Sequence, residues 1–191
     1  MLFRSPGLTF VVVSDDAKEK MKNRKTPIAS FYANLMTFDG YYEKKWFPYT
    51  MPISDIYGLR AAFNLIAGDK TLYERHARIG SATRAAVKEA GLKLHLQSGY
   101  SNTVTVFDIP ECTDAKSILD EMRTKYNIML AGSFDELSGK VIRIGHMGEN
   151  ARLEHMVPAL EALSATLTDL GVTLQGNLAD LFLKHYREFQ D

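Results

Sequence analysis

The feature that most constrains the fold is the run Leu-Thr-Phe-Val-Val-Val at residues 8–13. Six residues are too few to cross a membrane, and the β-branched and aromatic side chains favour a strand. A strand without polar and apolar alternation is typical of the middle of a parallel sheet, where both faces are buried. Such a strand needs neighbours on both sides, so we expect a segment outside this sequence to complete its sheet.

The remainder of the chain predicts alternating helices and strands, which is an α/β architecture. Ser14 is expected to cap a short helix, and Ser54 or Asp55 to cap a longer amphipathic one ending near Gly68. Further helices are expected over residues 30–38, 71–90, 113–126, 150–170 and 177–189, and strands over residues 92–97, 103–109, 128–130 and 140–145.

The charge balance excludes partners that bind mainly through attraction to a large net charge. The chain has 23 basic and 23 acidic residues, so nucleic acid or an anionic membrane gains no attraction from net charge. Cys112 is the only cysteine, which excludes an internal disulfide framework and favours a reducing compartment. With 46% hydrophobic residues and no secretory signal pattern, we expect a globular cytoplasmic protein.

The common motifs for phosphate and metal binding are missing from the sequence. There is neither a G-x-G-x-x-G nor a Walker A pattern. None of the five histidines lies four residues from another with a carboxylate between them, so no metal site is expected.

Arg143 is the most informative candidate, because it lies inside the otherwise apolar strand Lys-Val-Ile-Arg-Ile-Gly at residues 140–145. A partly buried guanidinium is costly unless an anion meets it. Its planar fork of donors matches a carboxylate. From charge alone, pairing with a fixed Asp or Glu of the chain is favoured over binding of a ligand's carboxylate.

Five motifs, in matching order and spacing, give the chain a family resemblance. They are Ser-Pro-Gly-Leu-Thr-Phe-Val-Val-Val-Ser at 5–14, Ser-Phe-Tyr-Ala-Asn-Leu at 30–35, Tyr-Thr-Met-Pro-Ile-Ser-Asp-Ile-Tyr-Gly-Leu-Arg at 49–60, Ser-Asn-Thr-Val-Thr at 101–105 and Gly-Lys-Val-Ile-Arg-Ile-Gly-His-Met-Gly at 139–148. With these motifs the chain resembles the carboxy-terminal portion of class V, fold type I, pyridoxal-phosphate aminotransferases, the group of alanine–glyoxylate and serine–pyruvate transaminases.

The resemblance implies a role for several residues. Arg143 matches the arginine that holds the α-carboxylate of the substrate, which shifts the balance toward ligand binding. Thr50 matches a threonine that contacts the phosphate of pyridoxal 5'-phosphate in the neighbouring subunit of a homodimer. Tyr49 and Phe47 lie beside it as further candidate contacts, although Phe47 stands where several members carry a tyrosine whose hydroxyl reaches that phosphate.

The resemblance also implies that the catalytic lysine lies outside the sequence. In the family pattern the Schiff-base lysine stands six residues before the proline of the Pro-Gly pair, which is Pro6 here, so it is expected immediately before Met1. The chain would then hold the end of the large cofactor domain at 1–53, a connecting helix at 54–68 and a complete small domain at 69–191, with a mainly antiparallel sheet flanked by helices.

Three origins are consistent with such a fragment: a truncated gene model, a remnant, or one half of a split enzyme completed by an amino-terminal half. In each case we expect the chain alone to be inactive as a transaminase between a small amino acid, of the alanine or serine type, and a keto acid, of the glyoxylate or pyruvate type. The alternative is a non-catalytic binding or regulatory module derived from the small domain.

Overall fold

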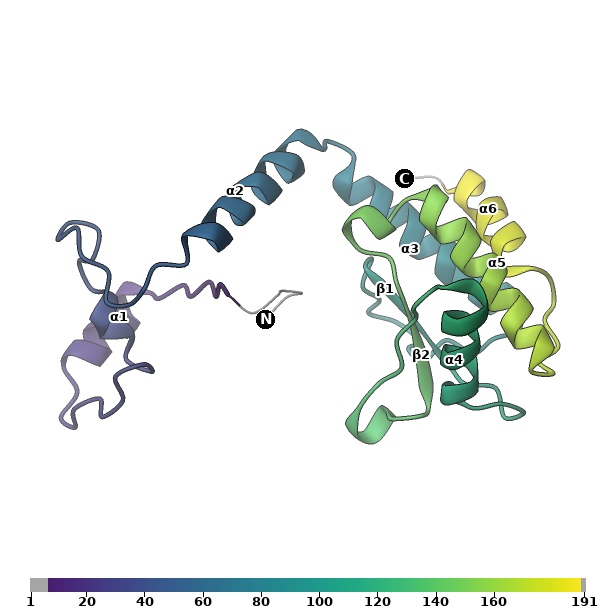
Figure 1. Cartoon of the computed structure of the whole chain (residues 1–191), viewed down its shortest axis with the longest axis horizontal. Coiled ribbons are helices and arrows are strands. Elements are labelled where there is room, and N and C mark those ends of the chain that lie inside the picture. Colours follow the sequence, from purple (N-terminus) through teal and green to yellow (C-terminus); the bar gives the residue numbers. More distant parts are fainter. Residues whose placement is uncertain (1–6, 190–191) are drawn as a thin grey trace. The chain divides into compact units, whose positions relative to one another are not determined.

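A computed structural model describes residues 7–189 of the chain. It divides into two compact units, Met1–Asp69 and Lys70–Asp191, which are treated separately below. Figure 1 shows the order of the elements along both units.

The first unit contains little regular structure besides two α-helices. These are α1 (Asp15–Lys22) and α2 (Ile53–Gly68), with the short 3-10 helix η1 (Leu35–Phe38) between them. Ser14 caps α1 as predicted, since its Oγ accepts the Ala17 N–H at 3.2 Å. The ion pair of Lys18 with Asp39, at 2.5 Å, joins α1 to the residue after η1.

Not every local prediction in this unit is met by the described residues. Residues 8–13 form no strand, and their side chains are largely exposed, with Val12 at 98%. A ladder requires a partner strand, and none of the described residues supplies one. The predicted side-chain cap of α2 is also missing, because the helix begins directly after Pro52.

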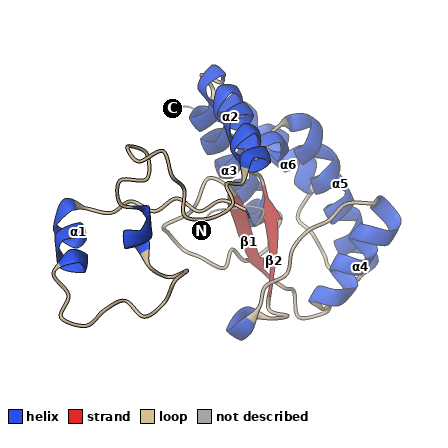
Figure 2. Cartoon of the chain, turned by 60° about the vertical axis from the view of Figure 1, so that its left-hand side comes forward, coloured by secondary structure: helices blue, strands red, loops and turns tan. Residues whose placement is uncertain are grey.

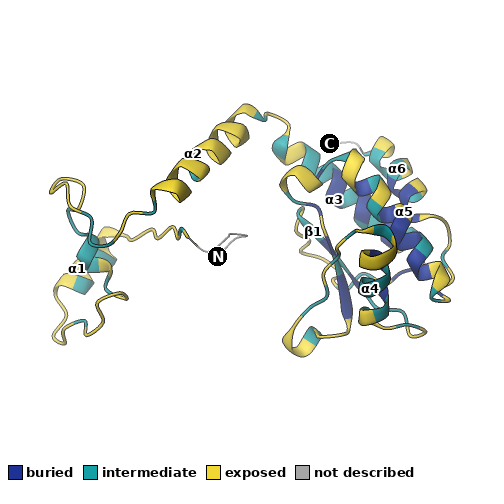
Figure 3. Cartoon of the chain, in the orientation of Figure 1, coloured by how far each residue is buried: buried dark blue, intermediate teal, exposed yellow. Residues whose placement is uncertain are grey.

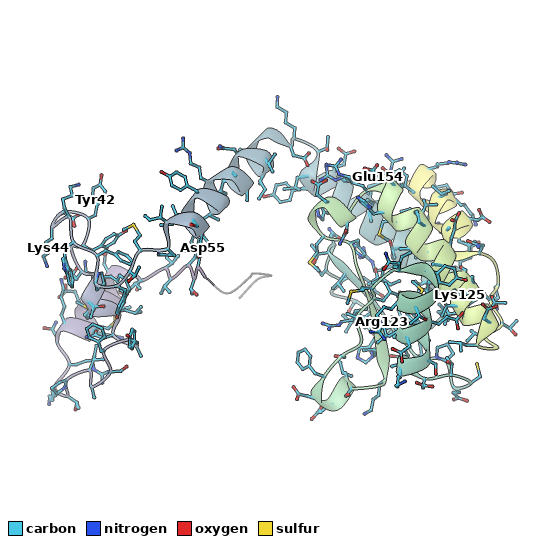
Figure 4. The ribbon with its side chains drawn as sticks, in the orientation of Figure 1. Tyr42, Lys44, Asp55, Arg123, Lys125 and Glu154 are labelled. Carbon is cyan, nitrogen blue, oxygen red and sulfur yellow. The ribbon has the colours of Figure 1, made fainter. Side chains whose placement is uncertain are left out.

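The second unit is built from four α-helices and two paired strands. The helices are α3 (Leu72–Glu89), α4 (Ala115–Tyr126), α5 (Leu153–Asp169) and α6 (Leu178–Glu188). Asp114 and Asn177 cap α4 and α6 through their side chains, which satisfies backbone N–H groups that the first turn leaves without partners. Lys125 of α4, labelled in Figure 4, forms an ion pair with Asp169 at the end of α5.

The strands β1 (Val104–Asp108) and β2 (Val141–Gly145) pair in the antiparallel direction. Their register sets Val106 opposite Arg143 and Phe107 opposite Ile142. The predicted strands at 92–97 and 128–130 reduce to single bridges at the sheet margins, Leu94 with Phe107 and Ala131 with Arg143. Figure 2 shows the helices of this unit gathered on one side of the two strands.

The hydrophobic core lies between these helices and one face of the sheet (Figure 3). Its largest fully buried side chains come from all four helices and both strands: Phe107, Phe182, Ile79, Ile118, Met122, Ile142, Leu160, Leu163, Leu167 and Leu178. Because side chains alternate along a strand, burying Phe107 and Ile142 turns Val106 and Arg143 toward the other, less buried face. The fold thereby presents Arg143 at a surface.

Candidate functional site

Arg143 lies in the middle of β2 and is fixed by contacts on both sides. Its backbone N–H donates to the Ala131 carbonyl at 2.7 Å, and its side-chain Nε–H donates to the Gly132 carbonyl at 2.6 Å. The ring of Phe134 lies 6.0 Å from the guanidinium carbon, a distance at which an aromatic face still attracts a cation. The segment 131–134 therefore orients the guanidinium without neutralising it.

No acidic side chain neutralises Arg143 within residues 7–189. None of the ion pairs formed by these residues includes it. The two terminal nitrogens of the guanidinium also make no hydrogen bond to a described residue, since Nε carries the only side-chain bond. The alternative of an internal Asp or Glu partner thus finds no support here, and the end of the fork is available for a bidentate carboxylate.

His146, three residues after Arg143, anchors this end of β2 to its surroundings. Its Nδ1–H donates to the Asn102 carbonyl at 3.2 Å, and its Nε2 accepts the Thr105 hydroxyl at 2.9 Å. The side chain is fully buried, and this burial lowers the pKa of the imidazole to about 4. His146 is therefore neutral and structural, a role that the motif around it did not reveal.

The loop before α2 carries a cluster of aromatic rings in the first unit. The rings of Phe38 and Phe47 contact each other edge to face, and each also contacts the rings of Tyr41 and Tyr49 in this way. Tyr49 also stacks on Tyr32 at 5.4 Å between centroids. The Tyr49 hydroxyl donates to the Phe31 carbonyl at 2.9 Å. The Tyr49 hydroxyl proton is therefore already used in a hydrogen bond within the first unit, and Phe47 has no hydroxyl that could donate to a phosphate.

Thr50 differs from both of these neighbours in its accessibility. It is exposed, and its hydroxyl forms no hydrogen bond with any described residue. A hydroxyl of this kind can donate to a phosphate oxygen. Of the three residues that sequence reasoning selected for cofactor binding, Thr50 fits a phosphate contact best.

Residues 7–189 show neither a clustered metal site nor a membrane-spanning helix. No group of three or more His, Cys, Asp or Glu side chains there is arranged to hold a metal ion. Over the same range, no helix has the length and apolarity needed to cross a bilayer.

Comparison with known proteins relates this arrangement to one class of enzyme. No family model matches the chain. The serine–glyoxylate aminotransferase of Arabidopsis thaliana is 34% identical over 189 residues, covering 94% of this chain and 46% of the relative. The pyridoxamine–pyruvate transaminase of Mesorhizobium japonicum is 34% identical over 171 residues, covering 87% and 44%.

Solved structures show the same relationship. A crystal structure of pyridoxamine–pyruvate aminotransferase from Mesorhizobium loti aligns with a TM-score of 0.81 and 31% identity, covering 92% of this chain and 46% of that one. The small antiparallel sheet with its flanking helices is thus the fold of the carboxy-terminal half of an aminotransferase.

The homologues and structural neighbours are class V pyridoxal-phosphate-dependent aminotransferases, and the chain spans somewhat under half the length of the curated relatives it matches. The predicted resemblance and the predicted fold class are both confirmed.

Proposed function

We propose that this chain is the carboxy-terminal part of an aminotransferase that moves an amino group between a small amino acid and a keto acid, with alanine or serine and glyoxylate or pyruvate as the substrate types. The observation that carries the proposal is Arg143, a guanidinium oriented by the Gly132 carbonyl and without an acidic partner in residues 7–189. Its terminal nitrogens would bind the α-carboxylate that amino-acid and keto-acid substrates share.

The role of Thr50 follows from its exposed hydroxyl in the aromatic loop. In this proposal Thr50 contacts the phosphate of pyridoxal 5'-phosphate bound by the neighbouring subunit of a homodimer. Tyr49 would support the loop through the Phe31 carbonyl, and Phe47 through ring packing. When bound, the cofactor supplies an electron sink for the negative charge that develops at the substrate Cα.

The chain by itself would not catalyse transfer, because the lysine of the reaction is expected immediately before Met1. Its residues supply substrate binding and one phosphate contact, while a complementing amino-terminal half supplies the remaining groups. We place the complete enzyme in the cytoplasm, since the single Cys112 suits a reducing compartment.

Complementation tests this function directly. The chain is mixed with the amino-terminal half of the Arabidopsis relative, ending at its cofactor lysine, together with pyridoxal 5'-phosphate. Cofactor binding is followed by absorbance, and transfer from alanine or serine to glyoxylate is followed by product formation. We expect activity in the mixture and none in either half.

Two variants sharpen the experiment. Arg143→Gln removes the guanidinium that would bind the substrate carboxylate, so it should abolish activity while leaving the cofactor absorbance. Thr50→Val should weaken cofactor binding. A folded mixture that binds the cofactor without turnover would favour the non-catalytic module instead. A mixture that folds but binds no cofactor would contradict both the transferase proposal and the role of Thr50.

A further inference from the structure

A cavity of about 130 Å³ lies in the second unit. It is formed by α3, β1 and the segment between them, and Arg143 is not among its lining residues. Its walls are mainly aliphatic, from Leu94, Leu96, Val104 and Val106. The volume equals that of about four molecules of liquid water, which restricts an organic occupant to a few heavy atoms.

Arg84 of α3 is the charged residue that lines this cavity. Its Nη1 donates to the Ser101 carbonyl at 3.0 Å, its Nη2 makes a long contact of 3.5 Å with Asn102 Oδ1, and its guanidinium carbon lies 4.9 Å from the Tyr100 ring centroid. The bare backbone of Gly80 permits this placement, because a Cβ there would come within 3.1 Å of Nη1. The guanidinium is thus held in one position with three of its five N–H groups uncommitted.

The charge on Arg84 is not compensated by the described residues. None of their ion pairs includes it, and partial burial lowers its pKa, opposed by the nearby Tyr100 hydroxyl and by no carboxylate. An arginine remains protonated at neutral pH even so. A cation that is partly removed from water and lacks an anionic partner is a favourable position for an anion to bind.

The hydroxyl groups around the cavity do not compete with Arg84 for an anion. The Tyr100 hydroxyl donates to the Leu96 carbonyl at 3.1 Å, and the Thr105 hydroxyl donates to His146 Nε2. Ser101 and Thr103 share a hydrogen bond of 2.6 Å. Arg84 therefore remains the strongest donor on a wall that is mainly aliphatic.

We propose that this cavity binds a small organic carboxylate with a short aliphatic tail, at a site separate from Arg143. Arg84 binds the carboxylate, and Leu94, Leu96, Val104 and Val106 enclose the tail. This combination of one charged donor with an aliphatic wall selects against inorganic anions, which have no apolar surface to bury, and against neutral molecules, which do not match the charge.

Butyrate is the probe for the test, with butyramide and inorganic phosphate as matched controls. The complete chain, isotope-labelled, is titrated with each compound, and amide shifts of Gly99, Tyr100 and Val104 are followed by NMR. We expect saturable shifts with butyrate and none with either control. Arg84→Gln should weaken butyrate binding about tenfold or more, which is the usual contribution of one charged hydrogen-bonding group.

Two further variants make the result decisive. Arg143→Gln should leave butyrate binding at this cavity unchanged, which separates this site from the proposed substrate site. Leu96 is 46% exposed, so a larger side chain there should not unfold the chain. Leu96→Trp should therefore block the cavity and abolish butyrate binding. This variant tests the proposal even if Arg84→Gln does not fold. Shifts that vanish in Arg143→Gln, persist in a folded Arg84→Gln variant, or never saturate would overturn the proposal.

Discussion

Thr105 and His146 are joined by a fully buried hydrogen bond of 2.9 Å between Oγ1 and Nε2, although 41 positions separate them in the sequence. The bond links β1 to the residue that follows β2. Because the other imidazole nitrogen donates to the Asn102 carbonyl, protonating His146 would place a second proton where Thr105 already donates. The pair therefore requires a neutral histidine.

A pH-dependent stability follows from this pair. The pKa of His146 is about 4 in the folded chain against 6.5 for an ordinary histidine. The unfolded chain therefore takes up the proton more readily than the folded chain does. The stabilisation that neutral His146 gives the folded chain is complete above pH 6.5 and is lost as the pH falls from 6.5 to 4. This stabilisation amounts to about 3 kcal/mol of unfolding free energy. Urea unfolding followed by circular dichroism at several pH values measures it.

The matched control for His146 is His155, which is exposed. His146→Gln should remove most of the stability change between pH 6.5 and 4, while His155→Gln should keep it. Equal pH profiles for the wild-type chain and His146→Gln would show that His146 is not the titrating group.

A second prediction concerns the core beneath the sheet. Phe107 is fully buried, and truncating it leaves a cavity, so Phe107→Ala should lower the unfolding free energy by about 3–5 kcal/mol. Phe10 is 70% exposed, so Phe10→Ala serves as a control of identical chemistry and should change stability by less than about 1 kcal/mol. Similar losses for both variants would contradict the assignment of the core.

A third prediction tests how Arg143 recognises its ligand in the complemented enzyme. Arg143→Lys keeps the charge but loses the planar fork, so KM for alanine should rise about tenfold to a hundredfold with kcat changed far less. Arg78→Lys is the control, because Arg78 donates to the Tyr186 carbonyl and stacks on that ring within the helical layer. An unchanged KM in Arg143→Lys would argue against carboxylate binding.

The apolar surface of the first unit leads to a fourth prediction. None of the side chains of α2 is buried, and Phe63, Leu65 and Ile66 are each at least half exposed. Exposed apolar patches of this kind promote association, so the chain should self-associate and bind a hydrophobic dye. Sedimentation should show less association for Phe63→Glu than for Arg60→Glu, a control on the same helix. A monomeric wild-type chain without dye binding would refute this prediction.

Local chemistry made several elements predictable from the sequence. Ser14 was identified as a helix cap because the cap requires only a hydroxyl and the next three residues. The strands around Val106 and Arg143 were found for a similar reason, since β-branched runs favour extended backbone. Ser54 and Asp55 failed as caps because Pro52 begins α2 earlier than their positions suggested.

Pairing between distant segments was not predictable to the same degree. The run at 8–13 has the composition of a buried strand, yet it is exposed and unpaired in the described chain. Two further expected strands survive only as the bridges of Leu94 and Ala131. A strand exists only where another backbone supplies its hydrogen bonds, and composition does not specify that partner.

The amino-acid sequence was sufficient to place a guanidinium inside an apolar strand and to relate the chain to aminotransferases through five short motifs. The tertiary structure decided which donors of Arg143 are used, why His146 is neutral, and that Arg84 lines a cavity. These properties depend on Gly132, Thr105 and Ser101, groups that are brought into contact only when the strands pair and α3 packs against them. Burial and hydrogen bonding are set by neighbours in space, which a linear pattern does not record.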